Sequence, residues 1–197
     1  MLVGVTGSIA CGKSEFCNIL RDLGYLVIDC DDISHKVIKK GRVAYYEVIY
    51  EFGEGILDKD REISRKKLGK IVFDDLDKKK KLEEIIHPKV IKEIKKYKKE
   101  PLVFFEVQLL FESHMENLFD KIICIGASFN NQVKRIMARN GLTQSEAMDR
   151  ILSQIQVKDK MALSDYQVYN DKTLLELKKV ANEIAQDIKK EVIEKNM

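Results

Sequence analysis

The chain opens with two short apolar runs on either side of an amphipathic segment. Leu2–Thr6 is apolar and β-branched, a pattern typical of a buried strand. Ser14–Leu23 carries apolar side chains at helical spacing, and Gly24 follows it, where glycine commonly ends a helix. Tyr25–Ile28 is predicted to be a second strand. The order strand, helix, strand predicts parallel pairing with helices on both faces of a sheet.

A long helical pattern follows over residues 33–99. It is interrupted at Gly41, at Gly53 and Gly55, and at His87-Pro88. Because the residue before a proline is disfavoured in helical geometry, we expect two helices to meet at His87-Pro88.

The second half of the chain returns to strands and then to helices. Leu102–Glu106 and Lys121–Ile125 have the length and apolar character of central strands. A helix is predicted over Thr143–Lys160, opened by a capping box between Thr143 and Glu146. The tail from residue 173 is amphipathic, with one apolar face made of Leu177, Val180, Ala181, Ile184, Ile188 and Val192.

Together these elements predict an α/β fold in a single domain over residues 1–197. Its core is expected at about 1–32, 100–126 and 164–197. A helical insert is expected at about 33–99, and a second helical excursion at about 127–163.

Composition narrows the class of protein. The chain has 197 residues, 45% of them hydrophobic, with 10 Gly and 2 Pro, which excludes a disordered or low-complexity chain. Its apolar runs are too short to span a membrane, and its first residues lack the basic region of a secretory signal. The cysteines lie singly, so we expect reduced, mostly buried thiols in a cytoplasmic protein: Cys11, Cys17, Cys30 and Cys124.

The net charge of +3 is unevenly distributed. Residues 65–99 hold 14 basic and six acidic side chains, an excess of eight, so the remainder carries −5. A solvated helix face, attraction of an anionic acceptor and nucleic-acid binding are the three interpretations. Phe73 and Tyr97 are the aromatic residues in this block, which disfavours stacking on nucleic-acid bases.

One motif carries the chemistry. Residues 7–14, GSIACGKS, fit the pattern G-x-x-x-x-G-K-[ST], follow a predicted strand and open a predicted helix. In this pattern the loop amides wrap phosphate oxygens, Lys13 reaches the β- and γ-phosphates, and the Ser14 hydroxyl binds Mg²⁺. The sequence therefore predicts binding of a nucleoside triphosphate.

Acidic residues follow the second strand. Asp29 and Asp31 are two positions apart, so in an extended segment their side chains share one face. One of them is a candidate base for the hydroxyl that attacks the γ-phosphorus, with Asp31 favoured and Asp29 more consistent with a helix cap. Glu106, which ends the third predicted strand, either holds a metal-bound water or is a solvent-exposed acid. No guanine-reading N-K-x-D motif is present, which disfavours a GTPase.

The chain resembles the dephospho-coenzyme A kinase family of P-loop kinases over nearly its whole length. The similarity begins in the phosphate loop and in VIDCD at residues 27–31. It continues through residues 65–73, IIHP at 85–88 and LLFE at 109–112. It extends to Arg135 and Arg139, to residues 146–154 including Arg150 and Gln154, and to residues 164–170.

This resemblance implies a three-layer P-loop core with a parallel sheet, an acceptor-binding helical insert and a helical lid. The implied reaction is ATP-dependent phosphorylation of the 3′-hydroxyl of dephospho-CoA, giving CoA and ADP, the last step of CoA biosynthesis. Mg²⁺ would accompany ATP. The partners expected are these small molecules, without nucleic acid or membrane, for a monomer or weak homo-oligomer.

The resemblance also implies residue roles. The catalytic residues would be Asp31, Lys13 and Arg139, with Ser14 and Asp31 as metal ligands. ATP would contact Gly7, Ala10, Cys11, Gly12, Lys13, Ser14, Glu15, Arg139 and Asn170. The acceptor would contact Asp29, Asp31, His35, Leu109, Glu112 and Arg135. Arg150 and Gln154 either belong to the lid or are ordinary surface residues.

Some positions depart from the family pattern. Gln108 stands where proline is usual, Asn140 where aspartate is usual, and Lys172 where glycine is usual. Lys172 puts the loop on the adenine side in doubt, because glycine there would permit a backbone geometry that lysine resists. Another small-acceptor kinase of the nucleoside monophosphate type and an ATP-gated nucleic-acid-binding protein remain the alternatives. Whether Asp29 or Asp31 contacts metal stays open.

Overall fold

The computed structural model describes residues 1–73 and 75–195, so Asp74 of the basic block lies outside the described residues. The chain forms two compact units. The first combines Met1–Asp29 with Lys98–Met197, and the second is Cys30–Tyr97.

The first unit is built on a parallel sheet. In the part of the chain that the structure describes, its strands are β1 (Leu2–Gly7), β2 (Val27–Asp29), β3 (Val103–Glu106), β4 (Lys121–Gly126) and β5 (Tyr166–Tyr169). They lie in the order β2-β3-β1-β4-β5, and every pairing is parallel. The predicted α/β fold with a parallel sheet is confirmed. The strand β5 was not predicted, because at the sheet edge only Val168 of its four residues is buried, and no apolar run marks it.

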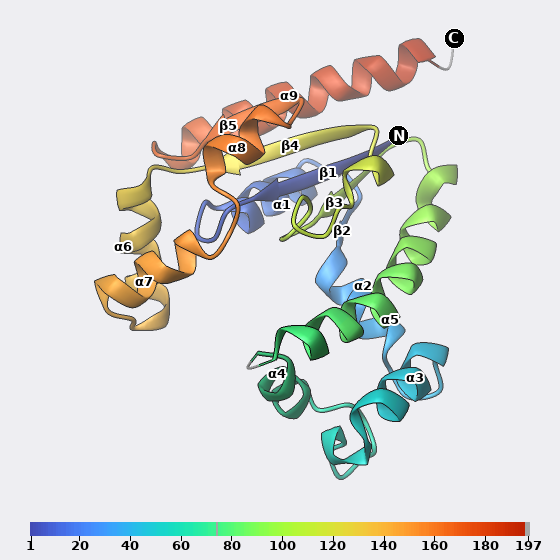
Figure 1. Cartoon of the computed structure of the whole chain (residues 1–197). Coiled ribbons are helices and arrows are strands. Elements are labelled where there is room, and N and C mark those ends of the chain that lie inside the picture. Colours follow the sequence, from blue (N-terminus) through green and yellow to red (C-terminus); the bar gives the residue numbers. More distant parts are fainter. Residues whose placement is uncertain (74, 196–197) are drawn as a thin grey trace. The chain divides into compact units, whose positions relative to one another are not determined.

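Two helices cover one face of this sheet. They are α1 (Lys13–Asp22) and α9 (Leu174–Lys195), which runs along the sheet in red in Figure 1. Val3 and Ile123 of the strands share a core with Phe16 and Leu20 of α1. The amphipathic tail is confirmed as a helix, whose buried residues are Leu177, Ala181, Ala185, Ile188 and Val192.

The other face is covered by the segment that follows β3 and by the short helix α8 (Val157–Ala162). That segment includes the 3₁₀ turn η3 (Glu116–Leu118). Two glycines allow close approach here. A Cβ at Gly4 would lie 2.7 Å from Leu110 Cδ1, and a Cβ at Gly126 would overlap the Met161 side chain. The sheet is thus the middle of three layers.

The helix predicted over Thr143–Lys160 is wrong as a single element. The structure has α7 (Gln144–Leu152), then a non-helical stretch, then α8. The stretch leaves the helix because its backbone is held by other segments: Glu112 accepts from Ile155 N–H at 3.3 Å. The capping box is confirmed, since Thr143 N–H donates to Glu146 Oε2 at 2.8 Å and Glu146 N–H donates back to Thr143 Oγ1.

The helix α6 (Phe129–Asn140) lies beside α7 (Figure 1). Val133 and Ile136 of α6 pack against Ala147 and Ile151 of α7 in a small core of their own. This pair of helices therefore forms a distinct substructure of the first unit.

The second unit is helical. Its elements are α2 (Cys30–Val37), α3 (Val43–Phe52), η1 (Glu54–Ile56), α4 (Arg65–Phe73) and α5 (Leu76–Lys95), and η2 (Lys96–Lys99) follows α5. A core of Tyr45, Val48, Ile56, Leu57 and Leu68 holds it together.

The expected helix junction at His87-Pro88 is wrong, because Pro88 lies inside the continuous helix α5. A proline there removes one backbone hydrogen bond and costs about 3 kcal/mol in an isolated helix. Burial of Val90 and Ile94 in the next turns offsets that cost.

Many lysines of the basic block are paired locally. Ion pairs join Lys78 to Asp75, Lys79 to Glu83, Lys81 to Glu84, Lys89 to Glu47 and Lys96 to Glu93. Four of these pairs use acids already counted in the block, so among them only Lys89–Glu47 reduces its positive excess; the side chains in these four pairs are well exposed, as the solvated-face interpretation expects. Among residues 1–73 and 75–195, no helix is long and apolar enough to cross a membrane. All four cysteines are buried.

Candidate active site

The GSIACGKS loop joins β1 to α1, at the carboxyl end of a central strand. Gly12 adopts φ +88°, and a Cβ there would overlap the Asn170 side-chain amide. A Cβ at Gly7 would overlap the carbonyl oxygen of Ile125 on β4. Both motif glycines are therefore required by close contacts, and Gly12 by its left-handed backbone as well.

Three consecutive carbonyl groups of the loop are held by side chains from elsewhere in the unit. Gln132 donates to Ile9 O at 2.9 Å, Arg135 to Ala10 O at 3.2 Å and Asn170 to Cys11 O at 2.9 Å. Arg135 also donates to Asn170 O at 2.7 Å, which ties two of these anchors together. Carbonyls fixed in this way leave the loop in one conformation, as a phosphate cradle requires.

The helix α1 begins directly after Gly12. Among the described residues no side chain caps its first turn, so its N-terminal amides are suited to receive an anion. The predicted phosphate contacts Lys13 and Ser14 are the first two residues of this turn.

Lys13 and Ser14 converge on one buried carboxylate. Lys13 Nζ donates to Glu106 Oε1 at 3.0 Å and Ser14 Oγ to the same oxygen at 2.6 Å. Arg21 Nη2 lies 3.5 Å from Glu106 Oε2. Glu106 is 4% exposed, so the solvent-acid interpretation is wrong. Burial opposes its ionisation, but the Ser14 hydrogen bond and the Lys13 charge outweigh burial and lower the pKa of Glu106.

Asp29 lies at the same edge of the sheet. It is paired in register with Glu106, at the carboxyl ends of neighbouring parallel strands. Paired positions in a parallel sheet point to the same face. Asp31 and His35 belong to α2, in the second unit, with Asp31 in the first turn of that helix.

A cavity of about 570 Å³ opens over the loop. The predicted ATP contacts Gly7, Ala10, Cys11, Gly12, Lys13, Ser14, Glu15, Arg139 and Asn170 all line it. Ser8, Ile9, Gln108, Arg135, Gln154, Lys172, Leu174 and Leu177 line it as well. The structure thus brings the predicted nucleotide contacts together around one space, and their binding of ATP stays a prediction.

Of the predicted acceptor contacts in the first unit, Asp29, Leu109 and Glu112 are not among the residues that line this cavity. Arg135 lines the nucleotide cavity and holds loop carbonyls. Leu109 is half-buried in the segment after β3. Glu112 of that segment pairs with the buried Lys160, at 2.6 Å. The acceptor roles of these residues stay predictions.

Sequence reasoning missed Gln132, which is 2% exposed and bonds both Ile9 O and Cys11 Sγ. A signal existed: Gln132 lies three positions before Arg135, on the same face of a helix. Lys160 was also missed, because nothing in the local sequence distinguishes a buried lysine from a surface one.

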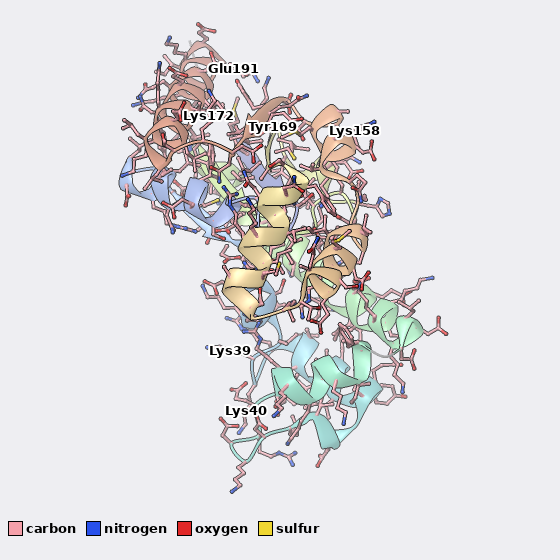
Figure 2. The ribbon with its side chains drawn as sticks, turned by 90° about the vertical axis from the view of Figure 1, so that its left-hand side faces the viewer. Lys39, Lys40, Lys158, Tyr169, Lys172 and Glu191 are labelled. Carbon is pink, nitrogen blue, oxygen red and sulfur yellow. The ribbon has the colours of Figure 1, made fainter. Side chains whose placement is uncertain are left out.

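Lys172 is labelled in Figure 2 and lies between β5 and α9. Its side chain is 75% exposed and its ammonium lies 3.4 Å from Glu176 Oε1. Among the described residues, left-handed backbone occurs outside glycine at Ala10, Arg61 and His114. Position 172 is not one of them, so the departure from glycine carries no backbone strain. Asn140, another position that departs from the family pattern, accepts a hydrogen bond at its Oδ1 from Arg139 Nε at 3.1 Å.

A model of the dephospho-CoA kinase family matches residues 1–176. The chain belongs to the dephospho-CoA kinase family. The predicted family, fold class and phosphotransferase activity are therefore confirmed. The activity is that of a dephospho-CoA kinase, in the last step of CoA biosynthesis.

Individual members of the dephospho-CoA kinase family agree. The chain is 40% identical over 178 residues to the dephospho-CoA kinase of Listeria monocytogenes, covering 87% of this chain and 89% of that one. It is 34% identical to the solved dephospho-CoA kinase of Campylobacter jejuni, with a TM-score of 0.73 over 100% and 98% of the two chains. The solved protein TT1252 of Thermus thermophilus is 28% identical, with a TM-score of 0.80 over 95% and 97%.

Proposed function

We propose that the loop cavity holds Mg²⁺ and ATP and that this chain's own residues align the γ-phosphoryl group for the 3′-hydroxyl of dephospho-CoA. The observation that carries this proposal is the convergence of Lys13 and Ser14 on Glu106 beneath a loop whose carbonyls are held. A phosphate site needs amide donors and a fixed cation, and the uncapped first turn of α1 and Lys13 offer both.

The nucleotide phosphates lie along the loop and the first turn of α1. Lys13 exchanges its contact with Glu106 for the β- and γ-phosphates, and Arg139 adds positive charge from α6. Arg135 acts through the loop, because its guanidinium is already bonded to Ala10 O and Asn170 O.

Mg²⁺ fits the oxygen donors at the foot of the loop. Ser14 Oγ and Glu106 Oε1 lie 2.6 Å apart, and Asp29 is paired in register with Glu106. Hydroxyl and carboxylate oxygens are the protein ligands that Mg²⁺ prefers, usually one or two beside phosphates and water. When bound, the ion neutralises charge on the β- and γ-phosphates. Ser14 would hold the ion directly. Asp31 is the proposed second protein ligand, with Asp29 as the alternative if it does not cap α2.

Asp31 is the proposed base. Its carboxylate accepts the proton of the 3′-hydroxyl as the oxygen–phosphorus bond forms. The bond from the γ-phosphorus to the β–γ bridging oxygen breaks, and ADP leaves with that electron pair. His35 lies one turn after Asp31 in α2, on the same face of that helix. It is the proposed contact with dephospho-CoA on that face.

The lid is confined to α6 and α7 in this proposal. The predicted lid extended to residue 163, but Val157 and Met161 of α8 pack onto Gly126 of the sheet. Closure of the α6–α7 pair over the cavity would exclude water, which otherwise competes with the hydroxyl for the phosphoryl group.

We also propose a cytoplasmic monomer or weak homo-oligomer. The four buried thiols suit a reducing compartment. Light scattering coupled to size-exclusion chromatography tests the oligomeric state: a mass near 22.8 kDa supports a monomer.

An acceptor panel tests the reaction. ADP release is measured with Mg²⁺, ATP and, in parallel, dephospho-CoA, AMP, dTMP or shikimate. Turnover with dephospho-CoA and its loss in Lys13→Ala are expected. Turnover with AMP or dTMP in place of dephospho-CoA would support the nucleoside monophosphate alternative instead.

A further inference from the structure

Gln154 bonds the phosphate loop from the non-helical stretch between α7 and α8. Its side-chain Oε1 accepts from Ile9 N–H at 3.0 Å, and the residue lines the loop cavity. The carbonyl of Ile9 accepts from Gln132 at 2.9 Å, so the peptide groups before and after Ile9 are both held. Because each peptide group is planar, these two hydrogen bonds fix the orientation of both planes.

The stretch that carries Gln154 is itself held by a side chain of the segment that follows β3. The next residue, Ile155, donates its N–H to Glu112 Oε1 at 3.3 Å. The same Glu112 oxygen lies 2.6 Å from Lys160 Nζ, and the Lys160 side chain is fully buried. Among the described residues, Glu112 Oε2 and Lys160 Nζ are both buried without a hydrogen-bond partner, so Glu112 is held by its charge attraction to Lys160 and by the hydrogen bond from Ile155 N–H.

Lys160 cannot shift easily. It lies on α8, where Ser164 Oγ donates to Lys160 O at 2.7 Å and Gln167 donates to Met161 O at 3.0 Å. Loss of the Glu112 charge would leave the buried Lys160 charge uncompensated, so the ion pair keeps the Glu112 carboxylate beside Lys160. The chain of contacts therefore runs from the sheet-bound α8, through Glu112 and Ile155, to Gln154 and the phosphate loop.

We propose that Gln154 and the ion pair between Glu112 and the buried Lys160 are positioning residues for phosphoryl transfer. This inference rests on the proposed role of residues 7–14 as the phosphate site. Gln154 sets the peptide at Ile9, and the Glu112–Lys160 pair fixes the backbone that presents Gln154. Glu112 then acts by orienting the loop, in place of the predicted contact with the acceptor.

The first test removes the Gln154 side-chain oxygen that accepts the hydrogen bond from Ile9 N–H, without changing the length of the side chain. Gln154→Met is compared with Gln156→Met, two residues later, whose side-chain amide contacts Gln154 O at 3.5 Å and does not line the cavity. We expect Gln154→Met to lower kcat about tenfold or more while KM for dephospho-CoA changes less than about threefold, because alignment and not acceptor binding is lost. Its melting temperature stays at that of Gln156→Met, which keeps wild-type kcat. A wild-type kcat in Gln154→Met overturns the inference.

The second test asks whether the Glu112–Lys160 pair acts through Gln154. Lys160→Met with Glu112→Leu removes both charges together, a change that buried pairs often tolerate. We expect this double variant to lower kcat, and we expect no more than about a twofold further loss when it is added to Gln154→Met. If the losses in kcat from the double variant and from Gln154→Met multiply, the Glu112–Lys160 pair acts independently of Gln154. That result would overturn the proposed positioning role of the pair.

Glu112→Gln provides a milder variant, since its amide oxygen still accepts from Ile155 N–H. Because the buried Lys160 charge is then uncompensated, we expect kcat to fall while KM for dephospho-CoA stays within about threefold of wild type. A large rise in KM for dephospho-CoA alone would restore the acceptor-contact role and overturn the anchor. Lys13→Ala separates this inference from the proposed function: if Lys13→Ala stays active, the phosphate site itself is wrong, whatever Gln154 does.

Discussion

Asn170 Nδ2 donates to the carbonyl of Cys11 at 2.9 Å, although the two residues are 159 positions apart in the sequence. The same amide occupies the place that a side chain at Gly12 would take. The last loop before α9 is therefore in contact with the phosphate loop. Any side chain at position 12 would displace this amide, and the Cys11 carbonyl would turn with it.

Gly12→Ala should therefore abolish ATP binding. The new methyl group overlaps the Asn170 amide, and the left-handed backbone adds about 1–2 kcal/mol of strain. Gly24→Ala is the matched control, because Gly24 has φ +86° but no described atom lies within 4 Å of the place that its new methyl group would occupy. Calorimetric titration with ATP should show binding in the control and none in Gly12→Ala. Equal affinities would contradict the contact.

Asp31→Asn should lower kcat by about 10²–10⁴ while the affinity for ATP changes little, since a general base acts in the transition state. Asp32→Asn removes the neighbouring acid from the same helical turn and serves as the control. Steady-state kinetics and ATP titration of both variants provide the measurement. Near-normal kcat in Asp31→Asn would show that another group takes the proton.

Glu106 should stabilise the fold in a pH-dependent way. Its pKa is lowered in the folded state from 4.5, so the ionised form stabilises the protein above that pH. The contribution is lost as the pH falls through the lowered pKa. The free energy of unfolding of wild type minus that of Glu106→Gln should therefore shrink from about pH 6 to about pH 3.

Urea unfolding across that pH range measures the difference, with Glu183→Gln on the exposed face of α9 as the control. A difference between wild type and Glu106→Gln that stays constant, or grows on acidification, would contradict the role of the Lys13 and Ser14 contacts.

Cys11 should resist alkylation although it belongs to the phosphate loop. It is 1% exposed, and burial raises its pKa to about 11, so the thiolate is scarce at neutral pH. Iodoacetamide at pH 8 should leave Cys11 unmodified in the folded protein and modify it in urea, as peptide mass spectrometry can show. Rapid modification under native conditions would mean that the loop opens.

The sequence was most informative where chemistry is local. Residues 7–14 are contiguous, so their spacing alone predicts the phosphate loop, and Thr143 and Glu146 predict their cap for the same reason. The apolar periodicity of the tail likewise predicts the buried face of α9.

The contacts that hold the loop were harder to predict, because they join distant segments. Gln132, Asn170 and Gln154 reach residues 9–11 from positions more than 120 residues away. The helix through Pro88 also went unpredicted, since the packing of Val90 and Ile94 overrides a local preference. The buried Lys160 is paired with Glu112, which lies in the segment after β3, far from Lys160 in the sequence.

The destination of the γ-phosphoryl group shows whether this protein phosphorylates the 3′-hydroxyl of dephospho-CoA. ATP carrying ¹⁸O in its γ-phosphate is incubated with Mg²⁺, dephospho-CoA and the protein, and the CoA formed is examined by ³¹P NMR and mass spectrometry. Labelled phosphate is expected on the 3′-oxygen of the ribose with the wild-type protein, and none with Lys13→Ala. Label found only in inorganic phosphate, or at another position of the acceptor, would contradict it.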